Sequence, residues 1–296
     1  ISSLQISAQE NFKKCLTTPL VEKELLSNPD YVEGRAKSIA RNIAWLAGNH
    51  AKKSTINIPV VVHIVYKSTH VNVGSGTNIS DAQIEDALRI LNEDYSKTNP
   101  EFPNPPRNTF LSYAGNPDLK FCFATTDPSG NPTNGITRTS TTKTSFDADT
   151  ESNDMKKNST LGKDGWDPSK YLNIWICNLS NSGGGMTLGY SYLPGLSSWN
   201  AWKDGLVVDF QYFGTISAAV TSDGRTPTHE IGHYLGLEHT FCESQSGGCC
   251  DNDGSNVNDT PAADDNIYWG VVTPTTNNNT CNDLLYSNIY STDVLD

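Results

Sequence analysis

Residues 229–239 read His-Glu-Ile-Gly-His-Tyr-Leu-Gly-Leu-Glu-His and contain three of the six histidines of the chain. His229 and His233 are four residues apart, so on a helix their imidazoles lie one turn apart on the same face. Two neutral imidazoles placed in this way can bind one zinc ion at ~2.0–2.1 Å each. Glu230 follows the first histidine and is predicted to take a proton from water at the metal.

The end of this stretch predicts a third ligand. Gly236 is expected to end the helix, because glycine adopts the left-handed cap conformation without strain. The chain can then turn and bring in His239, and three protein ligands leave one position open for water. The alternative is an amphipathic helix with incidental histidines, but the extended HExxHxxGxxH spacing is specific. The residues by themselves therefore predict metal-assisted hydrolysis.

Length and charge restrict the class of protein. The 296 residues suffice for one large domain or two modest ones. The net charge of -12 argues against nucleic acid and anionic membranes as partners, and it is compatible with bound calcium. No apolar run approaches the ~18 residues of a membrane span. No apolar signal segment stands at Ile1, so a secreted protein would have had its signal removed already.

The hydrophobic patterning indicates an α+β fold. Ser80 is expected to cap a helix over residues 81–96, and Thr226 to cap the helix of the zinc motif. Residues 126–170, rich in Thr, Ser, Asp and Asn, are interpreted as surface loops. His63 lies in an apolar run and is interpreted as a hydrogen-bonded strand histidine rather than a ligand. Strands are predicted at residues 56–66, 119–125, 171–177, 188–193 and 205–212.

The zinc motif resembles that of the metzincin metallopeptidases. Three further segments narrow the resemblance to the pappalysin family, especially its small microbial members: residues 188–194, His239-Thr-Phe and Asp259-Thr-Pro. The resemblance covers most of the chain from about Ile56 and implies a peptide bond as the substrate. It also implies a zincin-like catalytic domain with a mixed twisted sheet, a backing helix and an active-site helix.

This resemblance divides the chain into parts. Residues 1–53 are similar to a mainly helical pro-segment, and residues 54–296 to the catalytic domain. The catalytic domain is expected to split into an upper subdomain, 54–236, and an irregular lower subdomain, 237–296. Metzincins carry a methionine turn beneath the zinc, yet the only methionines are Met155 and Met186, both before the motif. We therefore expect the lower subdomain to be incomplete at its C-terminal end; the alternatives are that a second fragment completes it or that the protein lacks this turn.

The pro-segment contains Cys15, and residues 13–18 resemble the cysteine-switch segment of the family. Leu16 stands where a glycine commonly follows that cysteine. A thiolate at ~2.3 Å could occupy the water position on zinc and hold the enzyme latent. The alternatives for Cys15 are an unpaired surface thiol or an intermolecular disulfide. Activation would need a cut before Ile56, and Lys52-Lys53 is the expected place.

The substrate is expected to lie along an edge strand. By resemblance, this strand pairs with an extended peptide through its free N–H and C=O groups, and an ordinary edge strand is the alternative. Its predicted substrate-binding residues are Gly189, Tyr190, Ser191 and Tyr192.

A structural calcium ion is implied near the acidic loop at residues 250–260. The loop does not have EF-hand spacing, and a solvated acidic turn is the alternative. The nearest matches to the family's calcium ligands are Asp253, Asn258 and Thr260, with Asp251 and Asp259 possible.

The seven cysteines favour disulfides and an extracytoplasmic location, since four of them follow the zinc motif. By resemblance, Cys281 pairs with Cys249 or Cys250. Cys122 and Cys177 are either bridged or buried thiols.

The leading hypothesis is a latent, secreted zinc endopeptidase that binds peptide or protein substrates and its own pro-segment. The main alternative is a catalytically silent zinc module that holds a peptide or partner. The carboxylate of Glu230 favours the enzyme, because a purely binding site needs no general base. A calcium-stabilised adhesion domain is the weakest hypothesis, since it leaves the helix motif unexplained.

Overall fold

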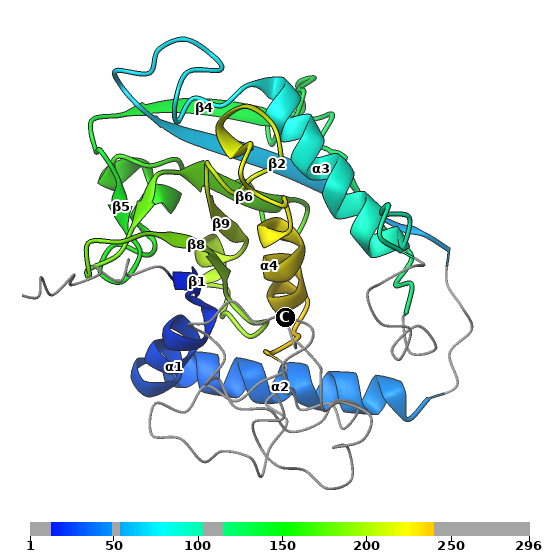
Figure 1. The fold of residues 1–296 in the computed structure, drawn as a ribbon. Coiled ribbons are helices and arrows are strands. Elements are labelled where there is room, and N and C mark those ends of the chain that lie inside the picture. Colours follow the sequence, from blue (N-terminus) through cyan, green and yellow to red (C-terminus); the bar gives the residue numbers. More distant parts are fainter. Residues whose placement is uncertain (1–12, 49–53, 103–114, 240–296) are drawn as a thin grey trace, which may run out of the picture. The chain divides into compact units, whose positions relative to one another are not determined.

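The computed structural model describes residues 13–48, 54–102 and 115–239 (Figure 1). The chain divides into two compact units, and all elements below belong to the first, which comprises Ile1–Pro105 and Ala114–Leu235. The second comprises Pro106–Tyr113 and Gly236–Asp296. The predicted division into pro-segment, upper and lower subdomains stays a prediction.

The first unit is built on a mixed, mostly parallel sheet, which confirms the α+β class. Its strands follow the order β1-β8-β9-β6-β2-β3, and β4 also pairs with β2. All pairs are parallel except β8 with β9. The strands of this sheet are β1 (Lys13–Cys15), β2 (Ile56–Lys67), β3 (Leu119–Phe123), β4 (Ile136–Thr141), β6 (Leu172–Cys177), β8 (Thr187–Ser191) and β9 (Leu206–Asp209). A separate two-stranded sheet pairs β5 (Phe146–Asp147) with β7 (Leu179–Ser180).

Four α-helices accompany the sheet within the described ranges: α1 (Thr17–Ser27), α2 (Pro29–Leu46), α3 (Asp81–Ser96) and α4 (Thr226–Tyr234). Four short 3-10 helices lie in the connections: η1 (Asp154–Lys156), η2 (Asn158–Thr160), η3 (Ala201–Lys203) and η4 (Ser217–Ala219). α3 begins as predicted, with the Ser80 side chain accepting a hydrogen bond from the Gln83 N–H. None of the helices in the described ranges has both the length and the apolar character of a membrane span.

Alternating side chains of the central strands supply two cores. On one face, Val62 and Ile174 join a cluster that includes Ile84 of α3 and Ile231 of α4. On the other face, Trp175 joins a cluster that extends to Tyr190 of β8 and to Leu16 and Leu20 at the start of α1. Burial on both faces explains why these strands read as continuous apolar runs. α4, which carries the first two histidines of the predicted zinc motif, is thereby packed against the same sheet that carries β8.

Two predictions about local structure were wrong. The stretch 126–170 is not only loop, because β4 lies within it and pairs in parallel with the second half of β2. β4 reads Ile-Thr-Arg-Thr-Ser-Thr, and its β-branched threonines favour a strand despite its polarity. Thr226 does not cap α4; it is the first helical residue, and Arg225 precedes it without a side-chain cap.

Cys122 and Cys177 are free thiols, and Cys177 is buried.

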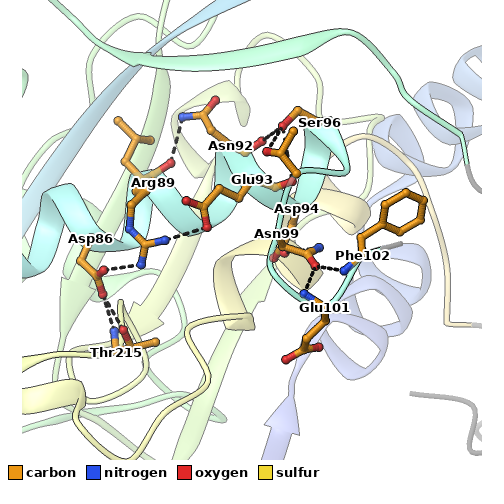
Figure 2. A network of polar contacts seen from close by, with 12 residues as sticks. Asp86, Arg89, Asn92, Glu93, Asp94, Ser96, Asn99, Glu101, Phe102 and Thr215 are labelled. Carbon is orange, nitrogen blue, oxygen red and sulfur yellow. Dashed lines mark hydrogen bonds and ion pairs between the residues drawn. The ribbon is translucent and has the colours of Figure 1, made fainter. Parts of the chain in front are cut away.

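Polar contacts from α3 fix the loops around α4, and Figure 2 shows a network of them. Asp86 accepts hydrogen bonds from the N–H and hydroxyl of Thr215 at 2.7 and 2.8 Å. Arg89 of the same helix forms ion pairs with Asp86 at 2.7 Å and with Glu93 at 2.6 Å, which hold the Asp86 carboxylate in position. One turn further on, Asp94 accepts a 2.7 Å hydrogen bond from the hydroxyl of Thr228 in α4. α3 therefore holds the first turn of α4 in place.

Candidate metal centre

α4 presents the first half of the predicted zinc motif. The Nε2 atoms of His229 and His233 are 3.0 Å apart, and the rings meet edge to face. The spacing of four residues on a helix produces this convergence. Two neutral imidazole nitrogens aimed at one point are the arrangement that a shared cation requires. Gly236 follows with a φ of 106°, the left-handed conformation expected where a helix ends at glycine.

Cys15 brings a thiol to the same point from the N-terminal strand. β1 pairs in parallel with β8, and this pairing places Cys15 opposite Gly189. The ligand atoms of Cys15, His229 and His233 lie within 4.8 Å of one another. Burial and the neighbouring Glu230 raise the pKa of the Cys15 thiol well above 9.0. A divalent cation at this point would have the opposite effect, because a coordinating thiol loses its proton. Cys15 is a free but buried thiol, so the alternative of a surface thiol is wrong.

Glu230 is fully buried beside this group. Burial raises its pKa to about 8, although contacts with Cys15 and Thr17 lower it in part. Its Oε2 atom is 3.2 Å from the Thr17 hydroxyl. Its Oε1 atom has no hydrogen-bond partner among the described residues. An unsatisfied, buried carboxylate oxygen is costly, and it is typical of a functional site.

Thr17 is a contact that the sequence analysis missed. Its hydroxyl accepts a 3.1 Å hydrogen bond from the Ser191 N–H and also lies 3.1 Å from the Ser191 carbonyl. Together with its approach to Glu230, Thr17 connects the start of α1 with the edge of β8 and with α4. The only available signal was its position two residues after Cys15, which in an extended chain puts both side chains on one face.

The predicted substrate strand is β8, followed by Tyr192. One edge of β8 pairs with β9, and β1 covers the other edge. Gly189 approaches α4 so closely that an added Cβ would lie 2.9 Å from Thr226 Cγ2. Ser191 Oγ donates to the Glu230 carbonyl at 2.9 Å. Tyr190 points to the opposite face of the sheet, where its hydroxyl donates to Ser152 at 2.8 Å. The backbone of β8, rather than its tyrosine rings, therefore faces the metal centre.

The remaining predicted ligands belong to the second compact unit. His239 belongs to the second compact unit, so its role as third ligand stays a prediction. The predicted calcium ligands, Asp253, Asn258 and Thr260, lie outside the described residues, as do the cysteines at 242, 249, 250 and 281. Buried His63 has the predicted strand role, with its ring nitrogens 2.7 Å from Thr137 Oγ1 and 2.9 Å from Asn173 Oδ1.

Comparisons with known proteins agree on one group of enzymes. The model of a peptidase family described as pregnancy-associated plasma protein-A matches residues 155–294. An extracellular metalloprotease of Verticillium alfalfae is 30% identical over 236 residues, which are 77% of this chain and 66% of that protein. The chain spans 56%, 66% and 59% of the length of three such fungal relatives.

Solved structures from Tannerella forsythia also match the chain, and one of them covers more of it than the Verticillium relative does. A promirolysin variant superposes with a TM-score of 0.69 at 36% identity, covering 84% of this chain and 76% of that one. Mature mirolysin in complex with a cleaved peptide superposes with a TM-score of 0.62 at 40% identity, covering 71% and 73%. The match to a pro-form extends over more of this chain than the match to the mature form.

Proposed function

Because the chain belongs to the pappalysin family of metzincin metallopeptidases, we propose that it is a zinc-dependent endopeptidase in its latent form. The observation that carries this proposal is the convergence of two imidazoles and a thiol beside a buried carboxylate. Protein or peptide substrates follow from the names of the related enzymes.

The donor set fits zinc, which binds imidazole nitrogen and thiolate sulfur in tetrahedral sites. His229 and His233 would hold the ion, and their Nε2 atoms are 3.0 Å apart. His239 is proposed as the third ligand from the spacing of the motif. A bound zinc ion would acidify water and polarise the carbonyl of the peptide bond to be cleaved.

Glu230 is proposed as the acid–base group. Its carboxylate would take a proton from the attacking water and later deliver it to the leaving amine. The unpartnered Oε1 atom supports this role, since no structural hydrogen bond among the described residues occupies it. The Ser191 hydroxyl donates a hydrogen bond to the Glu230 carbonyl, and this bond holds the backbone of α4 against β8 at Glu230.

Cys15 is proposed to act as a latency switch. Its thiolate would occupy the coordination position that water needs, and β1 would cover the edge of β8 that an extended substrate needs. In the mature enzyme, Gly189, Tyr190, Ser191 and Tyr192 would offer that edge to a peptide. Activation would follow a cut at Lys52-Lys53. A Cys15→Ala chain should mature faster than the unmodified chain, and equal rates of maturation would argue against the switch.

Secretion is proposed from the relatives, which are named extracellular metalloproteases. A calcium ion and disulfides near the acidic loop remain proposals that rest on the sequence and its resemblance alone. A shift of the melting temperature on adding calcium to zinc-loaded, chelator-treated protein would support the calcium site.

The alternative function is a zinc module that binds a peptide without cleaving it. The buried Glu230 beside the ligands favours catalysis over this alternative. Hydrolysis of a fluorogenic peptide after removal of residues 1–53 would distinguish the two.

The decisive experiment substitutes Glu230 by Ala and measures zinc content and casein cleavage after removal of residues 1–53. Zinc should stay bound, while turnover should fall by at least about 100-fold, the lower limit for general acid–base catalysis. The matched control is Glu85→Ala on α3, since Glu85 is an exposed glutamate away from the site. Retained turnover in Glu230→Ala would remove this residue from its proposed role.

A further inference from the structure

The pro-segment contacts the rest of the chain at a second place, distinct from the metal centre. This place is the surface formed by Leu193, Pro194, Gly195, Leu196 and Lys203, which we term the anchor face. α2 and the end of α1 contact it, and the metal-ligating group of Cys15, His229 and His233 includes none of its residues.

Tyr31 of α2 is the centre of this contact. Its side chain is fully buried and packs with Val21 and Leu193, with Leu196 at the border of the cluster. Its hydroxyl donates to the Leu193 carbonyl at 3.0 Å. One turn along the helix, the guanidinium of Arg35 donates to the Pro194 carbonyl at 3.2 Å. Two side chains of one helix therefore satisfy two consecutive carbonyls of the anchor face.

Gly34 lets α2 come close enough for these bonds. A Cβ atom added at Gly34 would lie 2.0 Å from the carbonyl oxygen of Gly195, and 2.8 Å from its carbonyl carbon. Both are backbone atoms and cannot rotate away. The neighbouring Gly195 has a φ of 146°, a conformation that side-chain-bearing residues rarely adopt. The backbones of α2 and the anchor face are thus in direct contact.

A charge pair adds to the contact. Glu24 of α1 forms an ion pair with Lys203, and both side chains are mostly buried, at 12% and 15% exposure. Burial by itself raises the pKa of Glu24, but hydrogen bonds from Lys203 and Asn28 outweigh burial and lower it. The charged state of Glu24 is therefore favoured when the pro-segment is docked.

We propose that the anchor face is a docking site for the pro-segment helices that works without Cys15, so that residues 13–48 stay bound as a separate molecule after the chain is cut within residues 49–53. The proposal rests on the proposed function in treating residues 13–48 as a pro-segment. Cutting the chain removes only the high effective concentration that the covalent link gives to the pro-segment at the anchor face. The buried aromatic anchor, the two carbonyl contacts and the ion pair remain. Release of activity then requires a second event, the removal or digestion of the helices.

The test measures binding rather than cleavage. In the full-length Glu230→Ala chain, residues 49–53 are replaced by the recognition sequence of a site-specific protease, and the cut protein is run on size-exclusion chromatography. The two pieces should co-elute, and a label on the N-terminal piece should dissociate slowly on dilution. Because no activity is read, this result is independent of whether the protein is a peptidase.

Substitutions in this cut protein then show which contacts hold the N-terminal piece. Gly34→Ala should speed dissociation at least about 30-fold, because the backbone overlap cannot relax. Tyr31→Phe removes one hydroxyl and should speed it about 5- to 10-fold. Cys15→Ser should leave the two pieces together.

The matched control is Ala36→Gly, at an exposed position of the same helix. It lowers helix propensity, whereas Gly34→Ala raises it. If helix stability alone decided binding, the control would dissociate faster and Gly34→Ala more slowly. Separation of the unmodified pieces on cutting, or release by Cys15→Ser but not by Gly34→Ala, would overturn the proposal.

Discussion

His63 is expected to make the folded chain sensitive to acid. The imidazole is fully buried in β2, with its centroid 5.4 Å from that of the Trp175 ring. Asn173 Oδ1 accepts a 2.7 Å hydrogen bond from the backbone N–H of Trp166, and because an amide oxygen can only accept, the His63 Nε2–H is its second donor. Nδ1 is left to accept from the Thr137 hydroxyl. Burial favours the neutral ring, and the hydrogen bond to Asn173 opposes this effect only in part.

The magnitude follows from the pKa of His63, which burial lowers from 6.5 to about 4. The unfolded chain binds a proton in this interval that the folded chain does not bind. The stabilisation is therefore fully present above pH 6.5 and is lost as the pH falls through about 4. At one pKa unit per 1.36 kcal/mol, the free energy of unfolding should drop by ~3 kcal/mol between about pH 8 and about pH 4 from this residue alone.

The assay compares the unmodified chain with His63→Gln, whose amide can repeat both hydrogen bonds but does not titrate. Urea unfolding is followed by tryptophan fluorescence, which Trp166 and Trp175 make sensitive to this region. Both proteins are measured with a chelator, so that protonation of the proposed zinc ligands contributes equally. The variant should lose ~3 kcal/mol less stability on acidification. Equal pH dependence, within about 0.5 kcal/mol, would refute the reasoning.

Three further substitutions test how the site is built. Gly189→Ala puts a Cβ 2.9 Å from Thr226 Cγ2 and 3.2 Å from Glu230 Cγ, so urea unfolding should show a loss of about 1–3 kcal/mol and the matured enzyme a lower kcat. Thr17→Val removes the hydroxyl beside Glu230 and Ser191, and the cut pro-segment should inhibit about 10-fold more weakly in a titration of peptide hydrolysis. Asp94→Ala removes the acceptor of the Thr228 hydroxyl, and thermal unfolding should show a loss of about 1–3 kcal/mol; an unchanged melting temperature would mean that α3 does not brace α4.

Local sequence determined the elements that carry the chemistry. The helix of α3 begins after Ser80 as predicted, because the capping hydroxyl and the apolar spacing act within a few residues. The pairing of His229 with His233 follows from helical geometry alone. The apolar runs of β2 and β6 predicted buried strands, since parallel strands packed on both faces need apolar side chains throughout.

The polar strand β4 escaped prediction, because only its pairing with β2 makes it a strand. Pairing partners distant in the sequence leave no periodic signal, and threonine-rich segments are typical of loops as well as strands.

Only the tertiary structure decided how the pro-segment docks. In α2 the regular apolar positions Val32, Ile39 and Ile43 are exposed, whereas Tyr31 and Arg35 are buried against another part of the chain. Amphipathic spacing indicates a helix but does not say which residues meet a partner. Likewise, the approach of Thr17 to Glu230 spans 213 positions in the sequence and exists because β1 joins the edge of β8. Contacts of this kind depend on strand order and backbone proximity, which residue patterns within one segment do not contain.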